Sequence, residues 1–154
     1  MYKEEYRHFS KILNRDMGIM IYGTGGIPFL GFVTQDSNCH NYEDFGMIDA
    51  LRDFIENEQI QMFVVDSVDK ESWSATEQDK TQRSLRQEQY FHYCINEVLP
   101  VIKERNPRTP AVTGFSMGGN HALLTFLRRP DLFRGVIALS GVYDSHFFYG
   151  DWVD

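Results

Sequence analysis

The amino-acid sequence predicts an α/β fold with a mostly parallel sheet and helices on both faces. Segments with the short apolar runs of strands alternate strictly with segments that have the apolar spacing of helices. The runs 29–33 and 60–65 are apolar almost throughout, as expected of strands that are covered on both faces. Strands and helices that alternate in this way form parallel sheets, whose ligand sites lie at the carboxyl ends of the strands.

The elements follow one another in a clear order. Apolar runs predict strands at 17–22, 29–33, 60–65, 111–113 and 136–140. Helical spacing predicts a helix at 42–57, a long helix from Leu85 to about Arg105, and a helix at 118–128 that ends before Pro130. Pro100 is expected to kink the long helix, because proline cannot donate a backbone hydrogen bond. The Gly-rich run 23–26 predicts a turn, and the polar stretches 34–41 and 66–78 predict loops.

Size and composition predict one globular domain over residues 1–154. With 42% hydrophobic and 24% charged residues, the chain has the composition of ordinary soluble proteins rather than of disordered or fibrous ones. A chain of this length buries enough surface to fold without disulfides or metals. Nothing in their spacing pairs Cys39 with Cys94, so we expect two free thiols in a reducing compartment.

Charge and hydropathy exclude several classes of partner. The formal net charge is −7 and no basic run stands out, which argues against nucleic acid or an anionic membrane as a partner. No apolar stretch approaches the length of a spanning helix, and the first residues lack the apolar region of a signal peptide. These features predict a cytoplasmic protein.

The motif that indicates chemistry is Gly114-Phe115-Ser116-Met117-Gly118, which has the form G-x-S-x-G. It lies between a predicted strand and a predicted helix, the context in which this motif forms a tight turn that exposes a nucleophilic serine. Glycine at the two flanking positions relieves crowding in such a turn, because it has no Cβ. The sequence therefore predicts that Ser116 is the nucleophile of a nucleophile elbow.

A serine that attacks a carbonyl also requires donors for the oxyanion that forms. The backbone N–H of Met117, at the start of the following helix, is expected to supply one. The second is expected from the loop 34–38, and we assign it to Gln35, with the residue on either side as the alternative.

Around this motif, the chain resembles the putative esterase family of α/β-hydrolases. The resemblance rests on residues 114–119, on the downstream run 136–144, and on the upstream run 63–67 with Ser72 and Trp73. That family includes esterase D-like S-formylglutathione hydrolases, feruloyl and acetyl-xylan esterases and mycolyltransferases. Membership implies an α/β-hydrolase-type sheet, a Ser–His–acid triad and no cofactor.

The triad is not completed by this sequence in the way that the family implies. The acid and the histidine follow the serine on later strands in this fold, but too few residues come after Ser116 to form those strands. We therefore expect the chain to be the N-terminal part of the fold, with the last strands missing. An exposed edge at the strand 136–140, with apolar residues 147–149 and Trp152 nearby, would then make homo-oligomers possible.

Other titratable groups are alternative partners of Ser116. Asp144 and His146 follow the serine in the right order, but they are close together in one loop, which favours a structural role; His40 is a further alternative. His121 is expected to point away from the oxyanion. Asp66, Asp69 and Glu71 are expected to be solvated loop residues, and no metal site is expected.

The leading function predicted from the sequence is hydrolysis of a small-molecule carboxylic ester through an acyl-serine intermediate. The alternatives are an acyltransferase that uses the same serine and a non-catalytic binding or assembly module. The sequence does not identify the acyl and alcohol groups.

Overall fold

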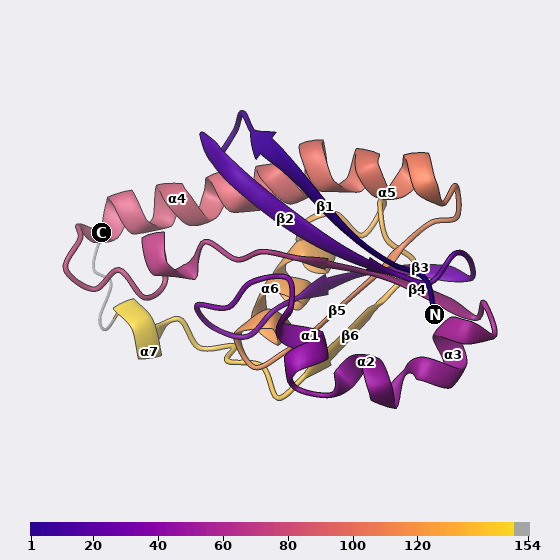
Figure 1. The fold of residues 1–154 in the computed structure, drawn as a ribbon. Helices are drawn as coiled ribbons and strands as arrows, with labels where there is room; N and C mark the ends of the chain where they lie inside the picture. The colour runs from indigo at the N-terminus through magenta and orange to yellow at the C-terminus, as the bar shows by residue number, and fades with distance from the viewer. Residues whose placement is uncertain (150–154) are drawn as a thin grey trace.

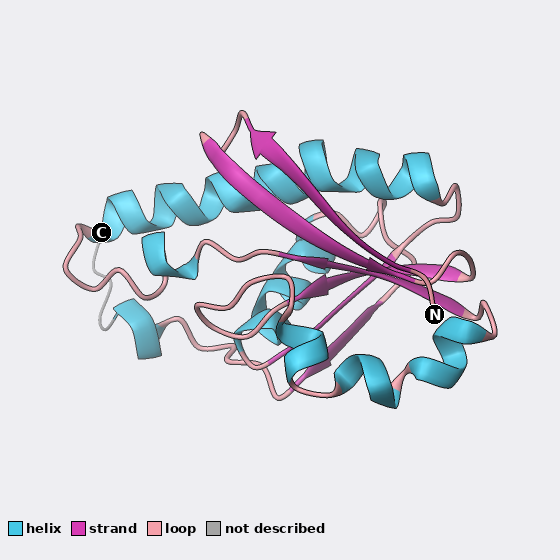
Figure 2. Cartoon of the chain, viewed as in Figure 1, coloured by secondary structure: helices cyan, strands magenta, loops and turns pink. Residues whose placement is uncertain are grey.

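The structure is a computed structural model that describes residues 1–149, and its centre is a twisted six-stranded sheet (Figure 2). The strands are β1 (Lys3–Ser10), β2 (Arg15–Tyr22), β3 (Ile27–Phe32), β4 (Ile60–Val65), β5 (Ala111–Phe115) and β6 (Val136–Leu139). Their order across the sheet is β1-β2-β4-β3-β5-β6. β4, β3, β5 and β6 run parallel, whereas β1 and β2 are joined in antiparallel fashion and β2 is antiparallel to β4. The predicted mostly parallel sheet is confirmed.

Helices cover both faces of the sheet, as the sequence predicted (Figure 1). On one face lie α4 (Lys80–Tyr93), the π-helical segment η2 (Cys94–Val98), α5 (Leu99–Arg105) and α6 (Met117–Arg128). On the other face lie α1 (Asn41–Asp44), α2 (Met47–Ala50) and α3 (Arg52–Glu56). A 3-10 turn, η1 (Asp69–Glu71), follows β4, and α7 (His146–Tyr149) is the last described element.

The two faces have separate apolar cores, because neighbouring side chains of a strand point to opposite sides. Phe63 and Val65 of β4 pack toward α4–α6, with Cys94 among their neighbours in that core. Met62 and Val64 pack toward α1–α3, in the core that contains Cys39. Both thiols are buried and free. None of the described helices is long and apolar enough to cross a bilayer.

The helix predicted at 42–57 is wrong as a single element. The structure has three short helices there, and the first break is at Gly46, which has φ 75°. This left-handed conformation ends a helical turn, and glycine adopts it without the steric penalty that other residues incur. The apolar spacing was correct, since Ile48 and Ile55 are buried, but spacing alone does not show a change of direction.

The long helix begins at Lys80, earlier than predicted. Its irregularity is a π-helical segment, which was not predicted. The π-helical segment η2 lies just before Pro100, and Figure 1 shows α4 and α5 as parts of one long rod. Proline removes one backbone hydrogen bond from the preceding turn, and a π turn is one way for a helix to accommodate that loss.

β6 is the edge of the sheet in the described part of the chain, as predicted. Ile137 and Leu139 are 51% and 45% exposed, and Phe147 is 75% exposed. Ile137 and Leu139 line an apolar groove of about 260 Å³ between β5–β6 and the helices α2–α3. The residues Trp152 and the side chain of Tyr149, named above for this patch, lie outside what the structure describes.

Candidate active site

Ser116 lies in a sharp turn between β5 and α6 and has strained backbone angles, φ 58° and ψ −128°. For a residue with a Cβ this conformation costs roughly 1–3 kcal/mol, so the surrounding structure must hold it. Two backbone hydrogen bonds do so: Ser116 N–H donates to Leu139 O at 3.0 Å, and Gly119 N–H donates to Ser116 O at 3.0 Å. Strained residues of this kind concentrate at functional sites.

The glycines on either side of Ser116 are required by space. A Cβ on Gly114 would lie 2.1 Å from Gly118 O, and a Cβ on Gly118 would lie 2.2 Å from Phe32 O. Backbone atoms cannot move away from such contacts as a flexible side chain would. The close approach at Gly118 also brings the end of β3, and with it the loop 34–36, against the start of α6.

The hydrogen bonds of the loop 34–36 are compatible with the oxyanion donors predicted from the sequence. Thr34 N–H donates to Asn41 Oδ1 at 3.0 Å, and Asp36 N–H donates to Asp69 Oδ2 at 3.3 Å. Among the described residues, the N–H of Gln35 between them has no acceptor, and neither has the N–H of Met117 at the first position of α6. Of the three positions considered, Gln35 is thus the one whose donor is not already used.

Asp66 and Asp69 are buried rather than solvated, so that interpretation of the 66–78 loop is wrong. Asp66 accepts hydrogen bonds from Gly18 N–H and Cys39 N–H at 2.7 and 2.8 Å. Asp69 Oδ1 lies 2.8 Å from Nε2 of His121, a residue of α6 that is also buried. A buried carboxylate requires such partners, because it has lost its hydration.

The Asp69–His121 pair was missed in the sequence because its members lie 52 positions apart in segments with no shared pattern. The available signal was the position of Asp66 and Asp69 directly after a buried strand, at the edge of the sheet where ligand sites occur.

An aromatic cluster covers the side of the turn next to Met117. Trp73 packs against Met117 and meets Phe148 edge to face, with ring centroids 5.2 Å apart. Buried Arg83 of α4 stabilises this cluster by donating to Trp73 O at 2.6 Å and to Phe148 O at 3.3 Å. These contacts place apolar side chains against Met117, the residue that follows Ser116.

Asp144 and His146 are not arranged as a triad with Ser116. Asp144 Oδ1 accepts from the backbone N–H of His146 at 2.9 Å, at the start of α7. Within residues 1–149, no hydrogen bond joins the His146 ring to Ser116 or to the Asp144 carboxylate. A catalytic part for these two residues stays a prediction.

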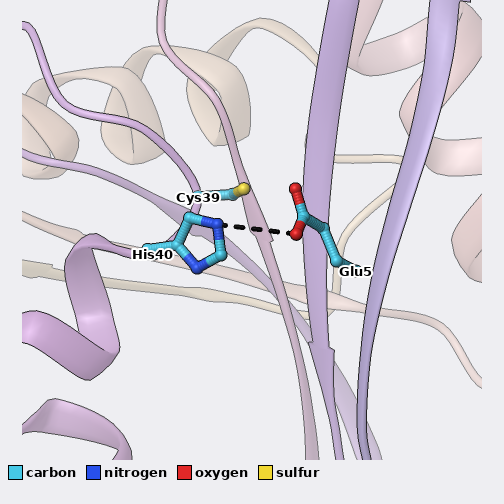
Figure 3. A group of neighbouring side chains, drawn as sticks. All are labelled: Glu5, Cys39 and His40. Atoms are coloured by element: carbon cyan, nitrogen blue, oxygen red, sulfur yellow. Dashed lines mark ion pairs between the residues drawn. The ribbon is translucent and has the colours of Figure 1, made fainter.

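A group of possible metal ligands lies between β1 and the loop that follows β3. Figure 3 shows Glu5, Cys39 and His40 pointing toward one another, with ligand atoms within 4.8 Å and His40 Nε2 3.7 Å from Glu5 Oε2. The guanidinium of Arg7 already binds Glu5, at 3.1 Å. Burial, and then the nearby Asp66 carboxylate, raise the pKa of the Cys39 thiol well above its usual range. Because the Glu5 carboxylate is already paired with Arg7, we assign no metal to this group.

Solved structures with the same fold are esterases and related hydrolases. An S-formylglutathione hydrolase from Staphylococcus aureus matches 99% of this chain with a TM-score of 0.71 and 14% identity. A ferulic acid esterase from the anaerobic fungus Anaeromyces mucronatus matches 92% with a TM-score of 0.70 and 13% identity. An enterobactin esterase from Shigella flexneri matches 86% with a TM-score of 0.61 and 19% identity.

This chain spans 63%, 59% and 34% of the lengths of those three proteins. The fold is therefore of the α/β-hydrolase type, and this chain spans only part of the length of these proteins. A comparison with curated protein sequences gives no match. The family model described as putative esterase matches residues 10–151, nearly the whole chain. With a sheet, a serine turn and a sequence that all agree, the chain belongs to the putative esterase family.

Proposed function

We propose that the protein is a serine esterase in which Ser116 forms an acyl-enzyme intermediate at a nucleophile elbow. The observation that carries the proposal is the strained turn at Ser116, with φ 58°, between a parallel strand and a helix. Family membership supports ester hydrolysis in general. The half-buried Ser116 hydroxyl has no hydrogen-bond partner among the described residues, so it is available to a base.

In the proposed reaction, Ser116 Oγ attacks the carbonyl carbon of the ester as a histidine accepts the hydroxyl proton. The carbonyl oxygen becomes an oxyanion, which the N–H groups of Met117 and Gln35 stabilise. The tetrahedral intermediate then expels the alcohol, which takes the proton from the histidine, and water hydrolyses the acyl-serine to the carboxylic acid. We propose that the histidine and its acid partner belong to the additional length that the matched esterases have beyond this chain.

A small ester is the proposed substrate, and the cytoplasm is the proposed location. The aromatic cluster of Trp73 and Phe148 beside Met117 favours an apolar group on one side of the scissile bond.

The test is Ser116→Ala in the full-length protein, assayed with p-nitrophenyl acetate and with a fluorophosphonate probe. We expect kcat to fall by roughly 10⁴-fold or more, because removing a nucleophile leaves only the contribution of binding and the oxyanion donors. Labelling by the probe should disappear while the circular dichroism spectrum is unchanged. Ser145→Ala, on the exposed stretch before α7, serves as the matched control. Wild-type turnover in Ser116→Ala would show that another residue is the nucleophile.

A further inference from the structure

A continuous hydrogen-bonded network connects the segments that surround Ser116. It begins at Trp73, whose indole N–H donates to Gln87 Oε1 of α4 at 2.9 Å. Gln87 Nε2 lies 3.3 Å from His121 Nδ1, and His121 Nε2 lies 2.8 Å from Asp69 Oδ1. The other oxygen of Asp69 accepts from the backbone N–H of Asp36.

The donors and acceptors of this network fix one tautomer of His121. The indole nitrogen of Trp73 only donates, so the Gln87 atom that it meets must be the carbonyl oxygen. The amide nitrogen of Gln87 then donates to His121 Nδ1, which must be unprotonated. The ring proton is therefore on Nε2, where it is donated to Asp69.

Packing holds the His121 ring in this orientation. Its centroid lies 5.9 Å from that of Phe32 on β3 and 5.3 Å from that of Tyr90 on α4. The side chain is 2% exposed, and Asp69 is fully buried. Neither group can reach solvent, so the pair has one geometry.

The end of this network is the loop that carries the second oxyanion donor. Asp36 has φ 62°, a left-handed conformation that is strained in a residue with a side chain. Its N–H bond to Asp69 holds this conformation, and Gln35 Nε2 adds a second anchor by donating to Ser74 Oγ at 2.7 Å. Between these two anchors, the backbone N–H of Gln35 remains unused.

We propose that His121 and Asp69 are positioning residues for the oxyanion site. By joining α6, which carries Met117, to the loop 34–36, the pair keeps the N–H of Gln35 and the N–H of Met117 aimed at one point. This inference rests on the proposed esterase function. It assigns no proton transfer to His121, whose ring is hydrogen-bonded to Asp69.

The kinetic test compares His121→Leu with His121→Gln in the full-length enzyme. Leucine removes the donor to Asp69, whereas the amide of glutamine can present an N–H near the position of Nε2. We expect His121→Leu to lose about 10–100-fold in kcat, with KM within about twofold of wild type. This is less than the roughly 100–1,000-fold found when an oxyanion donor is removed outright, because here the donor is displaced and not removed. His121→Gln should recover most of this loss. His92→Gln, on the exposed face of α4, is the control and should behave as wild type.

A second measurement distinguishes a positioning role of His121 and Asp69 from a role in protein stability alone. Affinity for a boronic acid that forms a tetrahedral adduct with the serine should fall in parallel with kcat/KM in His121→Leu and in Asp69→Asn. Equal kcat values in His121→Leu and wild type, or a loss seen in KM alone, would overturn the proposal. If neither His121→Leu nor Asp69→Asn folds, the pair is structural and the proposal also fails.

The tautomer gives a test that needs no variant and no activity. Long-range ¹H–¹⁵N correlation spectra of the wild-type protein should show His121 as the neutral form protonated at Nε2. A proton on Nδ1 would contradict the network. Failure of the proposed function is seen separately, as absence of fluorophosphonate labelling at Ser116 in the wild-type enzyme.

Discussion

At the scale of single residues, the geometry of the turn at Ser116 is set by its immediate neighbours in the chain. Ser116, Gly114 and Gly118 form a local motif, and the structure gives each glycine the steric reason that the motif implied. Asp69 and His121 were not found, because their pairing depends on how η1 and α6 meet in space. Local patterns predict turns well, but they do not show which polar groups become buried together.

The steric role of Gly118 can be measured directly. Gly118→Val should destabilise the protein by about 3 kcal/mol or more, because the new Cβ would meet Phe32 O and Val33 O, which are backbone atoms. Urea unfolding followed by circular dichroism gives the change, and esterase activity should fall with it. A Gly118→Val protein with wild-type stability would mean that β3 and α6 do not approach as closely as described.

At the scale of elements, the main error was the single helix at 42–57, and it has a simple cause. Apolar spacing continued through Gly46, since the short helices share one buried side, but the chain changes direction there. The strand β1 was also missed. Its burial alternates along Lys3–Ser10, but the pattern is hard to see in the sequence, because charged Glu4 takes an inward position and apolar Phe9 an outward one. Strands at the edge of a sheet often carry such charges.

Two glycines in open surroundings allow the effect of the backbone at Gly46 to be isolated. A Cβ would meet nothing within 4 Å at Gly46 or at Gly135, but only Gly46 has a positive φ. Gly46→Ala should therefore cost about 1 kcal/mol in unfolding free energy, from conformational strain alone. Gly135→Ala should be neutral or stabilise by up to about 1 kcal/mol, since it restricts only the unfolded chain. Equal effects of the two substitutions in urea titrations would show that the break at Gly46 needs no glycine.

At the scale of the whole molecule, the alternation of strands and helices was sufficient to predict the sheet and its two helical layers. The parallel direction of β4, β3, β5 and β6 is expected for strands joined by crossover helices, whereas their order across the sheet was not predicted from the sequence. In the described part of the chain, β6 is the last strand of the sheet. The exposed Ile137, Leu139 and Phe147 show that this side has apolar surface to cover.

The 154-residue chain, studied alone, should self-associate through β6. Its unpaired backbone groups and its exposed apolar residues offer a template for a second copy. Sedimentation velocity at low micromolar concentration should show dimers or larger species, and Ile137→Lys with Leu139→Lys should shift the distribution to monomer. We also expect no more than trace hydrolysis of p-nitrophenyl acetate by this chain. A monodisperse monomer with full activity would contradict both expectations and would return Asp144, His146 and His40 to consideration.

The two cysteines lie in different cores, so the reactivity of each thiol reports local opening of one face of the sheet. Cys94 lies in the core under α4–α6, and Cys39 lies in the core under α1–α3. Burial raises the pKa of both thiols, so a reagent that needs the thiolate reacts only when a layer of helices lifts from the sheet. The labelling rates of the variants Cys39→Ala and Cys94→Ala would each follow one layer. Equal rates would mean that the two faces open in a single event, whereas faster labelling of Cys39 would show that the three short helices detach while the long helix stays bound.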